Sequence, residues 1–90
     1  MEEVTKWEDV SFVISSSYRI RILKSLSTPK TPSKLSSELD INKTHISRAL
    51  SELEERNMIE CLTPSSRKGK IYKISILGKE ILSNASKLQM

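Results

Sequence analysis

The sequence has 90 residues, a length that fits one compact domain with a modest hydrophobic core. Hydrophobic residues make up 37% and charged residues 29% of it, which is typical of a folded protein and excludes a compositionally disordered chain. No apolar run approaches the roughly 18 residues of a membrane span. The acidic start lacks the basic and apolar regions of a signal peptide, so we expect a cytoplasmic protein with no membrane partner.

The cysteine and histidine content limits the chemistry further. Cys61 and His45 are the single representatives of their types, so the chain cannot form an internal disulfide or supply a three- or four-ligand zinc site. The sequence also has no glycine-rich phosphate loop and no second histidine to act as a base. We therefore expect no metal, no cofactor and no enzymatic activity, and we interpret Cys61 as a small buried hydrophobic residue.

The net charge of +4 suits an anionic partner. Its distribution is uneven, because residues 58–76 contain four basic residues and one acidic residue. The positive charge is therefore concentrated in that stretch.

Two amphipathic helices are predicted in the first 26 residues. The apolar residues of the first, residues 4–14, recur every three or four positions: Val4, Trp7, Val10 and Ile14. Three serines at positions 15–17 interrupt this pattern, and we expect a serine hydroxyl to cap the second helix, residues 18–26. That helix groups Ile20, Ile22, Leu23 and Leu26 on its apolar side and leaves Arg19, Arg21 and Lys24 outward.

A helix-turn-helix follows a loop at residues 27–30. Thr31 before Pro32 is typical of an N-cap followed by proline at the first helical position, which predicts a short helix over residues 32–39. After a three-residue turn, Asn42 can cap another helix, residues 43–56. The apolar residues of this helix follow the i, i+3, i+4, i+7 spacing, and its solvent side is polar: Ile46, Ala49, Leu50 and Leu53 against Lys43, Thr44, Ser47, Arg48 and Ser51.

A β-hairpin and a last helix complete the predicted fold. Residues 58–63 and 71–76 have strand character, and Tyr72, Ile74 and Ile76 share one face of the second strand. The polar loop between the strands, residues 64–70, is the predicted wing, and the last helix spans residues 77–88 with Ile81, Leu82, Ala85 and Leu88 on one stripe. The predicted class is mainly α with a small β-hairpin (α+β), as one domain over residues 1–90.

This order of elements, with INKTHISRALSELEERNMIE in its middle, resembles the winged helix-turn-helix regulators of bacteria and archaea over nearly the whole chain. It is similar to the arsenical-repressor-like and multiple-antibiotic-resistance-repressor-like families, in which a Thr-X-Ser-Arg type stretch opens the recognition helix. Here that stretch is Thr44 to Arg48. The resemblance implies that residues 43–56 enter the major groove, that the wing reaches the flanking backbone or minor groove, and that the outer helices make a homodimer.

Two departures from these families concern the backbone and the effector. Asp40 and Asn57 stand where such proteins often carry glycine, but both residue types adopt the left-handed conformation. Metal-sensing relatives need clustered cysteines, and this chain has only Cys61, so we do not expect a metal sensor.

The front of the recognition helix and the wing supply the predicted contacts to duplex DNA. Side chains at the N-terminal end of such a helix reach base edges, and Arg48 can offer a planar fork to guanine O6 and N7. The alternative interpretation is a solvated helix face and loop tip, with His45 partly packed. The predicted DNA-binding residues are Asn42, Lys43, Thr44, His45, Ser47, Arg48, Ser51, Arg67, Lys68 and Lys70.

The favoured function is that of a sequence-specific transcription regulator, a dimer on a partly palindromic site. Trp7 and the stripe of the last helix exceed what a small domain must expose, which favours the dimer. Two alternatives stay open: a winged-helix protein-interaction module and a non-specific architectural protein on DNA. Outward Lys43 and Arg48 favour a DNA partner over a protein partner.

Overall fold

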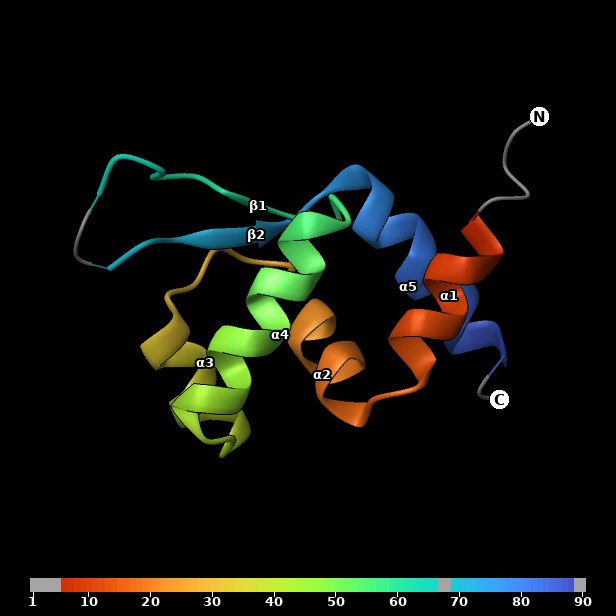
Figure 1. Ribbon diagram of the computed structural model, residues 1–90, viewed down its shortest axis with the longest axis horizontal. Coiled ribbons are helices and arrows are strands. Elements are labelled where there is room, and N and C mark those ends of the chain that lie inside the picture. Colours follow the sequence, from red (N-terminus) through yellow and green to blue (C-terminus); the bar gives the residue numbers. More distant parts are fainter. Residues whose placement is uncertain (1–5, 67–68, 89–90) are drawn as a thin grey trace.

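The residues that the computed structural model describes, 6–66 and 69–88, form five helices and one antiparallel hairpin (Figure 1). The helices are α1 (Lys6–Ile14), α2 (Ser17–Ser25), α3 (Pro32–Leu39), α4 (Lys43–Glu55) and α5 (Ile76–Leu88). The strands β1 (Ile59–Cys61) and β2 (Tyr72–Ile74) lie between α4 and α5 in the chain. The predicted class, mainly α with a small hairpin, and the predicted order of elements are confirmed.

The core is built around α2, which contacts each of the other four helices. Its Ile22 and Leu23 are fully buried, as are Leu35 from α3 and Leu53 from α4. No polar or charged side chain among the described residues is buried with them. The apolar stripe predicted for α4 is confirmed, because all four of its members are buried: Ile46, Ala49, Leu50 and Leu53.

Side-chain caps set the geometry of the helix-turn-helix, as predicted. Thr31 Oγ1 accepts a hydrogen bond of 3.1 Å from the Lys34 amide, and Pro32 begins α3. Asn42 Oδ1 accepts one of 2.8 Å from the Thr44 amide and starts α4. The backbone is left-handed at Asp40 (φ 56°), where α3 ends. These local interactions turn the chain between the two helices without a glycine.

The hairpin is shorter than the predicted strands, residues 58–63 and 71–76. It pairs Ile59 with Ile74 and Cys61 with Tyr72. The expectation that Ile76 continues the strand face is wrong, because Ile76 begins α5 and is 77% exposed. Cys61 is half-buried beside Tyr72 rather than fully buried as expected.

Ser75 is the reason that the strand stops. Its Oγ accepts from the Gly78 amide at 3.0 Å and donates to the Asn57 carbonyl at 2.7 Å. Its own amide donates to the Met58 carbonyl at 2.9 Å. Ser75 therefore caps α5 and joins it to the end of α4, where Asn57 has the predicted left-handed backbone (φ 64°).

A short segment before α3 pairs with the free side of β2. Lys30 and Tyr72 exchange two backbone hydrogen bonds, of 3.0 and 2.8 Å, and the Ile74 amide donates to the Leu26 carbonyl at 3.0 Å. Tyr72 is partly buried by this arrangement, and its burial raises the pKa of its phenol, with a further contribution from the carboxylate of Glu54. The predicted packing role of Tyr72 is confirmed.

The first two helices differ from prediction at three points. In α1 the buried face is formed by Val10 and Val13, whereas Trp7 is 60% exposed and Val4 lies outside the described residues. The hydroxyl of Ser16, the N-cap residue of α2, makes no cap hydrogen bond, contrary to expectation. Arg19 was expected to point outward but its side chain is only 18% exposed, because it packs against α1 and α4.

In α5 the stripe predicted for the last helix is confirmed for three of its members. Ile81 and Ala85 are buried and Leu82 packs against the core. The side chain of Leu88 lies outside the described part of the chain.

Candidate nucleic-acid interface

The exposed face of α4 contains a polar stripe of four residues. Thr44, Ser47, Arg48 and Ser51 are all exposed and follow the i, i+3, i+4, i+7 spacing of one helical face. The flanking residues Lys43 and His45 are exposed on its two sides. The structure therefore brings these predicted site residues of α4 onto one surface, opposite the buried stripe of the same helix.

The charge of α4 is strongly polarised along its length. Lys43 and Arg48 lie in its first half and form no ion pair with any described residue. Glu52, Glu54 and Glu55 occupy its end. The partial positive charge of the helix N-terminus adds to the two basic side chains. The first half of α4 therefore attracts an anion, whereas its last turn repels one.

Asn42 stands at the start of this surface as a cap. Its Oδ1 is engaged by the Thr44 amide, so that side-chain oxygen is occupied. The amide nitrogen of an asparagine side chain remains a donor when the oxygen is used in this way.

Two arginines near α4 have structural partners. Arg19 Nη2 lies 3.0 Å from Glu52 Oε1, and Arg56 Nη1 lies 3.0 Å from Asp9 Oδ1. Their guanidinium carbons lie 3.8 and 3.9 Å from the centre of the Phe12 ring. Two guanidinium groups cannot share one ring face at these distances, so they occupy opposite faces of Phe12. The cluster joins α1 and α2 to the end of α4.

Two residues of α2 that are not among the predicted DNA-binding residues lie beside the start of α4. The Tyr18 and His45 rings are 5.3 Å apart between centroids and inclined by 46°. Arg21 Nη2 donates at 2.6 Å to the carbonyl of Leu39, the last residue of α3. No local signal reveals either contact, because the partners are 27 and 18 residues apart in the sequence.

The base of the predicted wing is closed by hydrogen bonds. The Leu62 amide donates to the Ile71 carbonyl at 2.7 Å, and the Ile71 amide donates to Thr63 Oγ1 at 3.0 Å. Lys70 is exposed, and Gly69 beside it has the left-handed backbone (φ 56°) that favours glycine. Arg67 and Lys68 of the predicted site lie outside the described residues.

Two lysines, one before α3 and one in its first turn, are less available to a partner. Lys30 Nζ lies 2.7 Å from Glu38 Oε1, and Lys34 Nζ lies 3.9 Å from Glu38 Oε2. The hydrogen bond from Lys30 holds the pKa of the Glu38 carboxyl below its ordinary value. The carboxylate therefore offsets part of the positive charge on this side of the helix-turn-helix.

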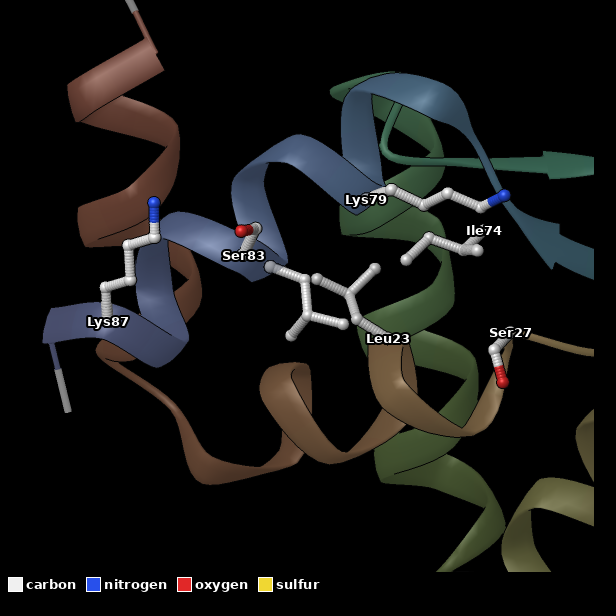
Figure 2. Close-up of a pocket in the computed structure, with 7 residues that line it drawn as sticks. Leu23, Ser27, Ile74, Lys79, Ser83 and Lys87 are labelled. Carbon is white, nitrogen blue, oxygen red and sulfur yellow. The ribbon is translucent and has the colours of Figure 1, made fainter. Parts of the chain in front are cut away.

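An apolar groove of about 640 Å³ lies between α2, β2 and α5 (Figure 2). Leu23, Ile74 and Leu82 supply its apolar lining, and Lys79 and Lys87 stand along it. None of its lining residues belongs to α3, α4 or the wing. The groove is therefore separate from the polar stripe of α4.

The described residues, 6–66 and 69–88, contain no cluster of three His, Cys, Asp or Glu side chains that could hold a metal ion. None of their helices has the length and apolar character required to traverse a bilayer.

Solved structures of transcription regulators have the same fold. The MarR family transcription regulator SP03579 aligns with a TM-score of 0.72 at 26% identity, over 83% of this chain and 52% of its own. HlyU from Vibrio cholerae aligns with a TM-score of 0.74 at 20% identity, over 98% of this chain and 97% of its own. A mutant MarR from E. coli, complexed with operator DNA, aligns with a TM-score of 0.71 at 21% identity, over 93% of this chain and 65% of its own. The resemblance expected from the sequence is confirmed, although the chain spans about half the length of the first of these regulators.

The family assignment comes from the sequence itself. No curated protein matches the chain. A family model described as the HVO_A0261 N-terminal domain matches residues 7–90. Because this match includes almost all of the sequence, the chain belongs to the HVO_A0261 N-terminal domain family.

Proposed function

We propose that this chain, acting as a single domain, is a sequence-specific duplex-DNA-binding transcription regulator. In this proposal α4 lies in the major groove and the wing, residues 64–70, contacts the flanking backbone or the minor groove. The observation that carries it is the polar stripe of α4 with Lys43 beside it. Lys43 and Arg48 are exposed and form no ion pair with a described residue, and no acidic residue of α4 precedes Glu52. The MarR bound to operator DNA supports it, because that protein has the same fold.

The residues of the stripe differ in what they can recognise. Arg48 offers a planar pair of donors that fits guanine O6 and N7, which makes it the main base-reading residue. The hydroxyls of Thr44, Ser47 and Ser51 contact bases or phosphates, and Lys43 contacts a phosphate at the edge of the groove. The acidic end of α4 faces away from the DNA backbone.

A homodimer through α1 and α5 is part of the proposal. The two helices pack against each other and lie together at the end of the molecule opposite α3 (Figure 1). Trp7 on α1 and Ile76 on α5 are 60% and 77% exposed, more than apolar side chains of this size usually are. A two-fold dimer would read a partly palindromic site. A monomer mass by light scattering at micromolar concentration would contradict this part of the proposal.

The proposal is tested by in-vitro selection of random duplex DNA at near-physiological salt. We expect recovery of an inverted repeat whose half-sites are about one helical turn apart. Weak binding without a motif, which disappears as salt rises, would indicate an architectural protein. No retained DNA at any salt concentration would contradict a DNA-binding function and favour the protein-interaction alternative.

The wing is expected to supply affinity without sequence preference. Replacing Arg67, Lys68 and Lys70 by glutamine should weaken binding to all duplexes alike, because these residues neutralise phosphates in the proposal. The slope of log affinity against log salt should become flatter by up to roughly three units. Titration of labelled duplexes at several salt concentrations measures it. The control replaces Lys79 and Lys87 of α5 by glutamine and should leave the slope unchanged.

A further inference from the structure

The N-terminal part of α2 lies beside the start of α4. Tyr18 is 36% exposed and its ring lies 5.3 Å from the ring of His45, in the first turn of α4. Arg21 is exposed one turn further along α2 and donates to the Leu39 carbonyl, three residues before Asn42. Tyr18 and Arg21 therefore flank the N-terminal half of α4 from a helix that is not part of the helix-turn-helix.

The dimensions of the major groove determine which part of the DNA Tyr18 and Arg21 can contact. A helix with its side chains is about 10–12 Å across, and the major groove is about 12 Å wide, so a helix in the groove fills it. Side chains that stand beside such a helix cannot reach base edges, and they meet the phosphates that border the groove. Tyr18 and Arg21 hold this position because Tyr18 contacts the first turn of α4 and Arg21 contacts the last residue of α3.

The chemistry of α2 suits an anionic partner. The helix has no acidic residue, and of its three cations only Arg19 is paired with a carboxylate of the described residues, that of Glu52. A guanidinium group has five N–H donors, and the described contacts of Arg21 use one nitrogen, on the Leu39 carbonyl. The hydroxyl of Tyr18 forms no hydrogen bond with a described residue and is a donor suited to a phosphate oxygen.

We propose that Tyr18 and Arg21 form a second DNA-binding element, an edge of α2 that binds the phosphate backbone beside the major groove. This inference rests on the proposed function and adds to it a site outside the helix-turn-helix and the wing. Tyr18 also positions the imidazole of His45, so it fixes a side chain of the recognition helix as well as binding phosphate. In this element Arg21 supplies the positive charge that attracts the phosphate.

The hydroxyl of Tyr18 is tested with Tyr18→Phe, which keeps the ring beside His45. Affinity for the selected duplex should fall roughly tenfold, because a hydrogen bond to a charged group is lost. A duplex series with one neutral methylphosphonate at each flanking position identifies the contacted phosphate. The wild type should lose affinity at that position, and Tyr18→Phe should lose nothing further there. Equal sensitivity of both proteins at every position would overturn the assignment of Tyr18.

The charge of Arg21 is tested with Arg21→Gln and the conservative Arg21→Lys. Arg21→Gln should flatten the slope of log affinity against log salt by about 0.9, and Arg21→Lys should restore it. A purely structural role on the Leu39 carbonyl would leave the slope unchanged in both. Lys87→Gln, which removes one exposed charge from α5, is the matched control and should keep the wild-type slope.

The outcomes separate this inference from the function on which it rests. If the wild type binds DNA and Arg48→Ala weakens it, but Tyr18→Phe and Arg21→Gln bind as the wild type does, the α2 edge is overturned and the proposed function stands. If all three variants lose affinity while their melting temperatures remain unchanged, both are supported. If the wild type retains no duplex, the proposed function and the α2 edge are overturned together.

Discussion

The Gly78→Ala variant is expected to unfold at a lower temperature than the wild type, although alanine is the better helix former. A Cβ atom at position 78 would lie 2.0 Å from the Met58 carbonyl oxygen and 2.8 Å from Ile74 Cγ1. The carbonyl cannot move away freely, because it accepts the Ser75 amide that joins α4 to α5. The first turn of α5 must therefore shift, which separates it from the start of the hairpin.

Helix propensity and steric overlap change the stability of the Gly78→Ala variant in opposite directions. Propensity alone favours alanine over glycine by about 1 kcal/mol, whereas overpacking a core typically costs about 1–3 kcal/mol. Overlap with backbone at 2.0 Å belongs at the upper end of that range, so the net effect is destabilising. In a domain of this size each kcal/mol lowers the melting temperature by roughly 4–8 °C.

Thermal denaturation followed by circular dichroism measures this effect. The control is Asn84→Ala, at an exposed position of the same helix, where the better propensity of alanine should slightly raise the melting temperature. A Gly78→Ala protein at least as stable as the wild type would contradict the close approach of α5 to Met58.

The second large effect is expected in DNA recognition by Arg48. Arg48→Ala should weaken binding to the selected site by about 1–3 kcal/mol, or roughly 5- to 150-fold, because the paired donors to guanine are lost. The preference at one base pair of each half-site should relax. Binding to unrelated duplexes should change much less, because it depends on phosphate contacts elsewhere. Fluorescence anisotropy with the selected and a scrambled duplex measures both.

Arg48→Lys is the matched control for this prediction. It keeps the charge at the same exposed position but not the planar fork, so non-specific binding should be retained and the base preference should still be reduced. If Arg48→Ala instead weakened both duplexes by the same factor, Arg48 would be a phosphate contact and its assignment as a base-reading residue would be wrong.

Local chemistry explains why the sequence predicted the helix-turn-helix well. The caps at Thr31 and Asn42 act over two or three residues, and the left-handed residues Asp40 and Asn57 belong to types that tolerate this backbone. The buried and exposed faces of α4 follow from helical periodicity alone. The polar stripe of α4 was therefore predictable residue by residue.

Features that depend on distant partners were not predictable. Arg19 points inward because Glu52, 33 residues away, and Phe12 receive it. Tyr18 reaches His45 only after α2 and α4 have packed. Ile76 continues an alternating pattern in the sequence, but Ser75 bonds to Asn57 and ends the strand before it. In each case a tertiary contact selects one of several side-chain orientations or strand ends that the local sequence allows.

The pairing of Lys30 with Tyr72 has a consequence for how the wing is held. A two-stranded hairpin is marginally stable in water, but β2 is hydrogen-bonded on both sides, to β1 and to the segment between α2 and α3. The amides of Tyr72 and Ile74 should consequently exchange with solvent deuterium more slowly than those of an isolated hairpin. The wing is therefore anchored at its base by a strand that is paired on both sides. A change in the length of the loop at residues 27–30 would alter this pairing and so shift the wing through β2.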